Sequence, residues 1–255
     1  MIKEFTILAD KMQLAYKNKN ENICIVGPIT LPVEKGDFKA TFNWYSWLTV
    51  PSQWSRDDVL RNISSMNLAF EQQSSVLVYG DFHNNEDAII RMHSICHTGD
   101  IFGSQRCDCG YQLNESMRLI QEHGCGALFY LASHEGRGIG LFSKALAYIL
   151  QENDYDTVQA NEALGFEDDT RDYSEAILVL EALRKQPVKL ITNNPKKLTS
   201  LQQHGLLAKG HIPIWGGKTE TNEFYLQTKI EKSGHIDVEG EVIHEQRHTL
   251  HEISS

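Results

Sequence analysis

The residues best suited to chemistry in this 255-residue chain are three of its five cysteines. Cys96, Cys107 and Cys109 are spaced as Cys-x10-Cys-x-Cys, with a glycine-rich turn between the first two. Closely spaced thiolates are ligands for Zn²⁺, and three protein ligands leave one coordination position open for water. Such a site makes hydroxide available near pH 7 for attack on an electrophilic carbon, for example a carbonyl, an amidine or a ring C=N. The spacing alone leaves two alternatives: a reduced cluster without metal, or a structural zinc completed by His93 or His97.

A second set of residues predicts an anion-binding surface near this cluster. Basic side chains recur in loops beside glycines and helix starts, where arginine offers forked contacts and lysine a point charge to phosphate oxygens. The loop from Ser133 to Gly140 lies between a predicted strand and a predicted helix, but it matches neither the P-loop nor the dinucleotide fingerprint. The alternative is that each base is a surface charge beside an acid. The residues concerned are Arg91, Arg106, Arg137, Lys144, Arg171, Lys196 and Lys197.

Alternating strand and helix patterns must position these side chains. Apolar runs predict strands at 23–26, 38–42, 75–80, 88–93, 127–132 and 188–192. Helical spacing predicts helices at 55–72, 112–123, 141–151, 171–186 and from Pro195 to Gly205, whereas the acidic stretch 152–170 is predicted to be a loop. Strands and helices in succession indicate an α/β fold, a mixed sheet with packed helices.

Composition excludes several classes of protein. The formal net charge of −10 argues against binding to a nucleic-acid backbone, although a basic cleft remains compatible with a small anionic substrate. No apolar run is long enough to cross a membrane. Five cysteines do not indicate a disulfide scaffold, and Cys24 and Cys125, in apolar contexts, are predicted to be buried. The N-terminus lacks the pattern of a secretory signal, so we expect a cytoplasmic protein.

Seven motifs follow one another along the chain. They are His93-Ser-x-Cys-x-Thr-Gly-Asp100, Arg106-Cys-Asp-Cys-Gly-x-Gln-Leu113, Glu135-Gly-Arg-Gly-Ile-Gly-Leu141, Asp156-Thr-Val-x-Ala-Asn161, Leu164-Gly-Phe166, Arg171-Asp-Tyr173 and Leu190-Ile-Thr-Asn-Asn-Pro-Lys-Lys197, followed by Tyr225-Leu-x-Thr-Lys229. In this order they resemble the motifs of GTP cyclohydrolase II, the first enzyme of riboflavin biosynthesis. The resemblance covers about residues 74–235, which we interpret as the catalytic domain. Residues 1–73 are then an N-terminal extension and insertion, and residues 236–255, with His244, His248 and His251, a polar tail.

The resemblance implies a reaction and its participants. The family opens the imidazole ring of GTP when zinc-bound water attacks C8, and it releases formate and pyrophosphate. The product is 2,5-diamino-6-ribosylamino-4(3H)-pyrimidinone 5′-phosphate. Mg²⁺ accompanies the substrate triphosphate, and the family forms homodimers. A related cyclohydrolase with another nucleotide or a partial reaction, or a nucleotide-binding zinc protein without turnover, is the alternative.

Roles carry over to the matching positions of this chain. Cys96, Cys107 and Cys109 resemble the zinc ligands, Asp169 the proton acceptor, and Tyr148 a tyrosine that completes ring opening. Arg171 resembles the proposed nucleophile toward the α-phosphorus, but a guanidinium is almost always protonated, so an electrostatic role is the alternative. The residues at positions that hold GTP are Arg91, Met92, His93, Ser94, Ile95, Gln112, Glu135, Gly136, Arg137, Thr157, Thr192 and Lys197.

The chain departs from the family pattern beside the site. Ile95 stands where the family has glutamate before the first cysteine, and Ser133-His134 stands where it has Arg-Gln before Glu-Gly-Arg. These changes are expected to affect base recognition or rate.

Overall fold

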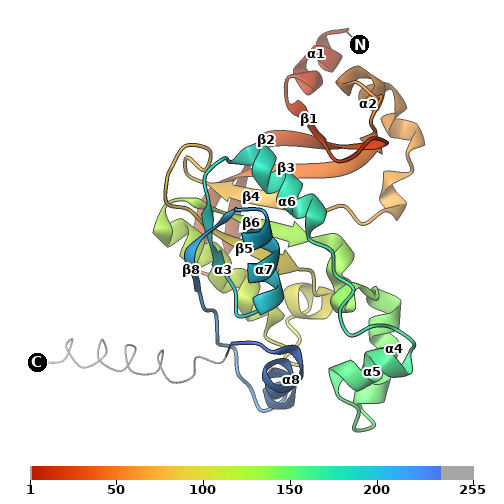
Figure 1. Cartoon of the computed structure of the whole chain (residues 1–255), viewed down its shortest axis with the longest axis vertical. Helices are drawn as coiled ribbons and strands as arrows, with labels where there is room; N and C mark the ends of the chain where they lie inside the picture. The colour runs from red at the N-terminus through yellow and green to blue at the C-terminus, as the bar shows by residue number, and fades with distance from the viewer. Residues whose placement is uncertain (1, 237–255) are drawn as a thin grey trace, which may run out of the picture.

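The computed structural model describes residues 2–236, which fold around one eight-stranded sheet (Figure 1). The strand order is β1-β2-β3-β4-β6-β5-β7-β8. The predicted mixed α/β fold is therefore confirmed. The strands are β1 (Met12–Tyr16), β2 (Glu21–Lys35), β3 (Phe38–Pro51), β4 (Ser75–Tyr79), β5 (Ile89–Ser94), β6 (Gly126–Leu131), β7 (Val188–Ile191) and β8 (Leu207–Ile212).

One half of the sheet is antiparallel and the other half is parallel. Strands β1, β2, β3, β4 and β6 pair antiparallel in that order, whereas β6, β5, β7 and β8 pair parallel. Strands β2 and β3 form a hairpin whose turn contains Gly36, and they are much longer than the predicted strands 23–26 and 38–42. They extend because Ile23, Ile25, Phe42 and Trp47 are core residues along their length.

The helices cover both faces of the sheet. Along β6, Ala127 and Phe129 pack in the cluster that includes α6 and α7, whereas Leu128 packs in the cluster that includes α3. Neighbouring residues of a strand point to opposite faces, so α6 and α7 lie across the sheet from α3. The helices are α1 (Ile2–Ala9), α2 (Arg56–Asn62), α3 (Cys109–His123), α4 (Leu141–Gln151), α5 (Thr157–Ala163), α6 (Ser174–Leu183), α7 (Pro195–Gln203) and α8 (Glu223–Ser233).

Several predicted boundaries and one predicted loop are wrong. The stretch 152–170 contains α5, because Asp156 accepts bonds from the Val158 and Gln159 amides while Gln159 bonds back to the Asp156 amide. This capping box stabilises a helix whose sequence has little periodicity. The helix predicted at 55–72 ends at Asn62 and is followed by two 3₁₀ turns, Ile63–Ser65 and Leu68–Phe70.

Two further helix starts differ from prediction. Helix α6 begins at Ser174 instead of Arg171, because side-chain contacts described below hold the preceding residues in a loop. Helix α3 begins at Cys109 instead of Gln112 and ends, as predicted, at His123, where it is followed by Gly124 with a left-handed φ of 84°. Helix α7 begins at Pro195, as predicted, and the Asn194 side chain caps it by accepting from the Lys196 amide.

The topology creates a crevice at the carboxyl ends of β5, β6 and β7. The chain passes from β5 to β6 through α3 on one face, then from β6 to β7, on the other side of β5, through α6 on the opposite face. Ligands of open α/β sheets bind where neighbouring connections diverge in this way. None of the helices within residues 2–236 combines the length and apolar character needed to cross a bilayer. The predicted tail with His244, His248 and His251 lies outside the described residues.

Candidate active site

A cleft opens at these strand ends, and it is lined by all the residues assigned from the sequence except Met92. The Met92 side chain is fully buried in the core beside α6, and its carbonyl accepts a hydrogen bond of 2.8 Å from Lys197 Nζ. The assigned residues that line the cleft are Arg91, His93, Ser94, Ile95, Cys96, Cys107, Cys109, Gln112, Glu135, Gly136, Arg137, Tyr148, Thr157, Asp169, Arg171, Thr192 and Lys197.

Three sulfur atoms converge at this cleft. Cys96 follows β5, Cys107 lies in the loop before α3, and Cys109 is the first residue of α3, yet their Sγ atoms all lie within 4.8 Å of one another. The Cys96 and Cys107 sulfurs are 3.6 Å apart. Tetrahedral zinc with sulfur bonds of about 2.3 Å separates its sulfurs by about 3.8 Å, so this spacing suits a single ion.

Two glycines allow the sulfurs to come this close. Gly99 lies in the π-helical turn His97–Ile101, and a Cβ added there would lie 3.0 Å from Cys107 Sγ and 3.1 Å from Cys96 Sγ. A Cβ at Gly110 would lie 2.4 Å from the Gly99 carbonyl oxygen. A side chain at either glycine would therefore push the turn that follows Cys96 away from the start of α3.

A buried ion pair supports the first cysteine. Lys144 Nζ, on α4, lies 3.1 Å from Cys96 Sγ and 2.6 Å from a Glu135 oxygen, and the other Glu135 oxygen accepts from the His97 amide at 2.7 Å. Hydrogen bonds from the Cys107 and Cys109 thiols, and the Lys144 charge, lower the pKa of Cys96. The neighbouring sulfurs and burial raise the pKa of Cys109 well above its usual value. The surroundings thus favour the thiolate form of Cys96 over that of Cys109.

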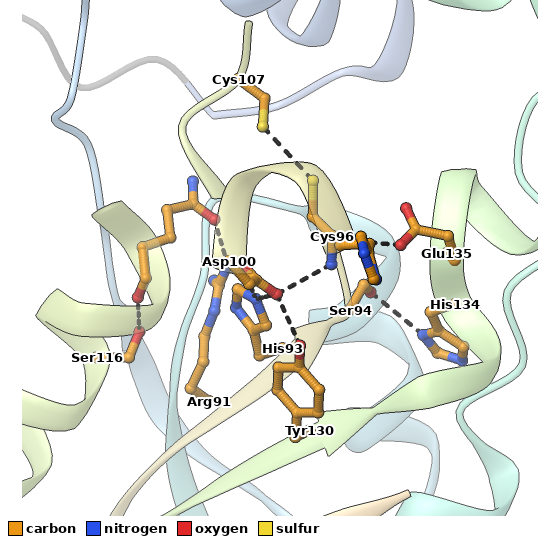
Figure 2. A network of polar contacts seen from close by, with 12 residues as sticks. Arg91, His93, Ser94, Cys96, Asp100, Cys107, Ser116, Tyr130, His134 and Glu135 are labelled. Atoms are coloured by element: carbon orange, nitrogen blue, oxygen red, sulfur yellow. Dashed lines mark hydrogen bonds and ion pairs between the residues drawn. The ribbon is translucent and has the colours of Figure 1, made fainter. Parts of the chain in front are cut away.

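The two histidines considered as fourth ligands do not join the sulfurs. Figure 2 shows that His93, Tyr130 and the Cys96 amide all converge on Asp100. His93 Nε2 lies 3.0 Å from Asp100 Oδ2, and the Cys96 amide donates a hydrogen bond of 2.9 Å to the same oxygen. The His97 ring packs edge-on against Phe102. Among residues 2–236, the candidate metal ligands that cluster are the three cysteines alone, which supports the open-site interpretation.

A buried polar chain connects β5 to α8 beneath the cluster. Arg91 donates to the Ile191 carbonyl at 2.9 Å and to the Gln112 side-chain oxygen. Gln112 donates to Asp108 at 2.6 Å, and Lys229 of α8 donates to the other Asp108 oxygen at 2.6 Å. Asp108 lies between two cysteines, so this chain fixes the loop that presents them. Buried polar groups must be satisfied in this way.

The opposite wall carries a carboxylate–guanidinium pair. Arg171 Nε and Nη2 each donate to Asp169 at 2.7 Å, and its Nη1 donates to Ser94 Oγ at 3.3 Å. Burial alone would raise the pKa of Asp169, but the Arg171 hydrogen bonds and charge outweigh it and lower this pKa to about 2. Burial alone would lower the pKa of Arg171, but interactions with Tyr173 and Asp169 outweigh it and raise this pKa above the usual value. Both groups are therefore ionised at neutral pH.

The start of α7 adds a buried lysine. The side chain of Lys197 lies near Arg91, Arg171 and Lys229, and desolvation followed by these like charges lowers its pKa well below the usual value. It donates a hydrogen bond to the neutral Met92 carbonyl. Basic side chains gathered beside the N-terminus of α7 are a favourable site for an anion.

The fourth wall is formed by the glycine-rich loop and by α4 and α5. Gly136 and Arg137 adopt left-handed φ values of 62° and 66°, and Arg137 forms an ion pair with Asp168. Tyr148 bonds Thr98 Oγ1 at 3.2 Å, and Arg106 stacks 4.2 Å above its ring. The surface-charge alternative describes Lys196, which is largely exposed, and Arg106, which pairs with the exposed Glu152. It does not describe Lys144 and Lys197, which are buried.

Sequence reasoning missed several lining residues. Asn161, Asn193 and Asn194 lie in motifs quoted above, and Tyr225 and Lys229 in the Tyr-Leu-x-Thr-Lys motif of α8. Their place within the motifs was the available signal, whereas no motif contained His235. The predictions that Cys24 and Cys125 are buried are confirmed.

The sequence model of the GTP cyclohydrolase II family matches residues 62–213, which is more than half of the chain. This chain belongs to the GTP cyclohydrolase II family. Its cysteine cluster and cleft lie within or beside the matched region, whereas α8 lies beyond it.

Similar proteins are named for riboflavin biosynthesis. The chain is 39% identical over 224 residues to riboflavin biosynthesis protein RibBA of Bacillus cereus, covering 88% of this chain and 51% of that protein. It is 49% identical over 160 residues to RibBA of Bacillus velezensis, covering 62% and 40%. It is 47% identical over 164 residues to monofunctional riboflavin biosynthesis protein RIBA 3, chloroplastic, of Arabidopsis thaliana, covering 64% and 32%. The matches thus span about half or less of these relatives.

Proposed function

We propose that this protein is a zinc-dependent GTP cyclohydrolase II. It hydrolyses the imidazole ring of GTP and releases formate and pyrophosphate, leaving 2,5-diamino-6-ribosylamino-4(3H)-pyrimidinone 5′-phosphate. The observation that carries this proposal is the convergence of three thiols with an Asp169–Arg171 pair and a buried cation in one cleft, in a member of this family.

Cys96, Cys107 and Cys109 would hold the zinc. Their sulfur spacing, the nearby Lys144 ammonium and the absence of a fourth ligand among the described residues fit a three-coordinate protein site. When bound, zinc supplies Lewis acidity and activates water near pH 7. The raised pKa of Cys109 gives a reason for metal dependence, since the cation stabilises thiolates that the protein alone disfavours.

The cations of the opposite wall would bind the triphosphate. The Lys197 ammonium donates to a neutral carbonyl, and Arg171 presents a guanidinium near it. A phosphate would relieve the repulsion that lowers the pKa of Lys197. Mg²⁺ enters with the triphosphate in this proposal, since residues 2–236 offer a single metal-ligand cluster.

The same contacts assign Arg171 an electrostatic role. A nucleophile needs a lone pair. All three guanidinium nitrogens of Arg171 already donate hydrogen bonds, and the raised pKa of Arg171 keeps the group protonated. Arg171 would therefore stabilise phosphate charge. Asp169 is a carboxylate and can accept a proton, but it becomes an effective base only when the phosphates draw Arg171 away from it.

Tyr148 would act as a proton donor near the opened ring. Burial raises the pKa of Tyr148, so the hydroxyl is protonated at neutral pH. The hydroxyl is held by Thr98, two residues from Cys96, which places it beside the sulfur cluster. Homodimer formation, a cytoplasmic location and the division into residues 1–73, 74–235 and 236–255 stay predictions from the sequence.

The test uses the full-length protein loaded with zinc and incubated with GTP and Mg²⁺. We expect one zinc per chain and equal amounts of formate and pyrophosphate. Arg171→Ala should keep the zinc and lose most turnover. If neither product forms, the proposal is wrong. If pyrophosphate forms without formate, the protein performs only a partial reaction. Parallel assays with dGTP and ATP test whether Ile95, which lines the cleft, changes nucleotide choice.

A further inference from the structure

The imidazole of His134 is a buried group beside the cleft to which the proposed mechanism gives no role. It is 3% exposed and lies on the glycine-rich loop after β6. Its Nδ1 lies 3.2 Å from Ser94 Oγ, and its Nε2 lies 2.8 Å from the Asp172 carbonyl oxygen. Its ring also packs edge-on against Tyr173, with centroids 4.9 Å apart. Figure 2 shows His134 directed toward Ser94.

These two contacts define one tautomer. A carbonyl only accepts, so Nε2 must carry the proton that is donated to Asp172. Nδ1 of the neutral ring is then an acceptor, and the Ser94 hydroxyl must donate to it. Burial lowers the pKa of His134 to about 4, so the ring is neutral at physiological pH.

The direction of the Ser94 O–H bond determines whether Ser94 Oγ can accept a hydrogen bond from Arg171. With its proton on His134, Ser94 Oγ presents lone pairs to Arg171 Nη1, 3.3 Å away. The bond from His134 to the Asp172 carbonyl holds the backbone next to Arg171. The same loop is held at its other end, where the Thr170 amide donates to the Arg137 carbonyl at 3.1 Å. His134 thus restrains both the side chain and the backbone of Arg171.

We propose that His134 is a positioning residue, which orients the Arg171–Asp169 pair through the Ser94 hydroxyl and the Asp172 carbonyl. This inference rests on the proposed function, since it assigns His134 a role in the same reaction. His134 itself is not required to touch the nucleotide. Misplacing a catalytic group by about 1 Å costs on the order of 100-fold in rate, which sets the expected size of the effect.

The decisive experiment compares His134→Phe in two backgrounds, wild type and Arg171→Ala, with formate release as the assay. Phenylalanine supplies an aromatic ring in place of the imidazole but removes the hydrogen bonds to Ser94 and Asp172. We expect kcat to fall roughly 10- to 100-fold in the wild type, with a much smaller change in KM, and no further fall in Arg171→Ala. His134→Gln should recover most of the activity, because one amide can accept from Ser94 and donate to Asp172. An equal loss in both backgrounds, or no loss, would overturn the proposal.

A measurement independent of activity covers the case in which His134→Phe does not fold. Nitrogen-15 NMR of the wild-type imidazoles, assigned by the signal missing in His134→Gln, should show a neutral His134 protonated at Nε2. Ser94→Ala should shift its Nδ1 resonance. A ring protonated at Nδ1 contradicts the inference. Failure of the wild type to release formate is a different outcome, since it refutes the proposed function instead.

Discussion

The Gly99→Ala substitution tests the sulfur cluster most directly. Gly99 is buried in the π-helical turn, and a Cβ added to it would lie 3.0 Å from Cys107 Sγ, 3.1 Å from Cys96 Sγ and 3.2 Å from Cys109 Cβ. The methyl group would therefore contact all three proposed ligands at once. The φ of Gly99 is not in the left-handed region, so alanine adds contacts without backbone strain.

The magnitude follows from these distances. Non-bonded heavy atoms pack at about 3.5 Å or more, so each sulfur must move by about 0.5 Å to accept the methyl group. Metal sites tolerate about 0.2 Å of change in ligand distance. The displacement of the Cys96 and Cys107 sulfurs would therefore exceed that tolerance. Disturbing the support of metal ligands typically costs about 10- to 100-fold in affinity, which corresponds to roughly 1.4–2.8 kcal/mol.

The assay is competition for zinc between the protein and a chromophoric chelator. We expect Gly99→Ala to bind zinc at least roughly 10-fold more weakly than the wild type and to lose formate release in proportion. Gly103→Ala is the control, because its Cβ meets nothing within 4 Å although its φ is 69°. That variant should lose some stability through strain but keep its zinc affinity. Equal zinc affinity of Gly99→Ala and the wild type would refute the argument.

Three further predictions concern single residues. Cys107→Ser should lose zinc and formate release together, whereas Cys125→Ala, which changes a buried cysteine outside the cluster, should keep both; metal analysis decides. The pKa of Asp169 is lowered to about 2, so its carboxylate contributes about 2 kcal/mol of stability above pH 4 that is lost as the pH falls toward 2. Urea unfolding should therefore show a gap between wild type and Asp169→Asn that narrows from pH 6 to pH 3. Lys229→Met leaves buried Asp108 without its cation and should cost about 3–5 kcal/mol in urea unfolding, and adding Asp108→Asn should recover part of it; a full cost in the double variant would contradict this.

The local pattern determined the elements that carry the site. Apolar runs located β4 to β7 within a residue or so, because buried strands need continuous apolar side chains. Asn194 and Pro195 marked the start of α7, since capping depends on adjacent residues. The spacing of Cys107 and Cys109 predicted ligands on one short segment, and the structure brings Cys96 to them.

Elements without a regular apolar period were missed by predictions based on periodicity. Helix α5 was predicted to be a loop because its stability comes from the Asp156–Gln159 capping box and from burial of Ala160 and Asn161. The lengths of β2 and β3 were underestimated because buried and exposed residues do not alternate regularly along these strands. The capping box is a local interaction that apolar periodicity does not reveal, whereas the length of the hairpin is set by tertiary packing.

Contacts between distant residues were decided only by the tertiary structure. Lys229 meets Asp108 across 121 positions, and His134 meets Ser94 across 40. Sequence identified His93 as a candidate fourth ligand, but in the folded chain its ring is held by Asp100. The sequence by itself thus determined which atoms are available to bind a metal and phosphates. The fold decided which of them face one another, because that depends on strand order and on burial of charge, neither of which is encoded locally.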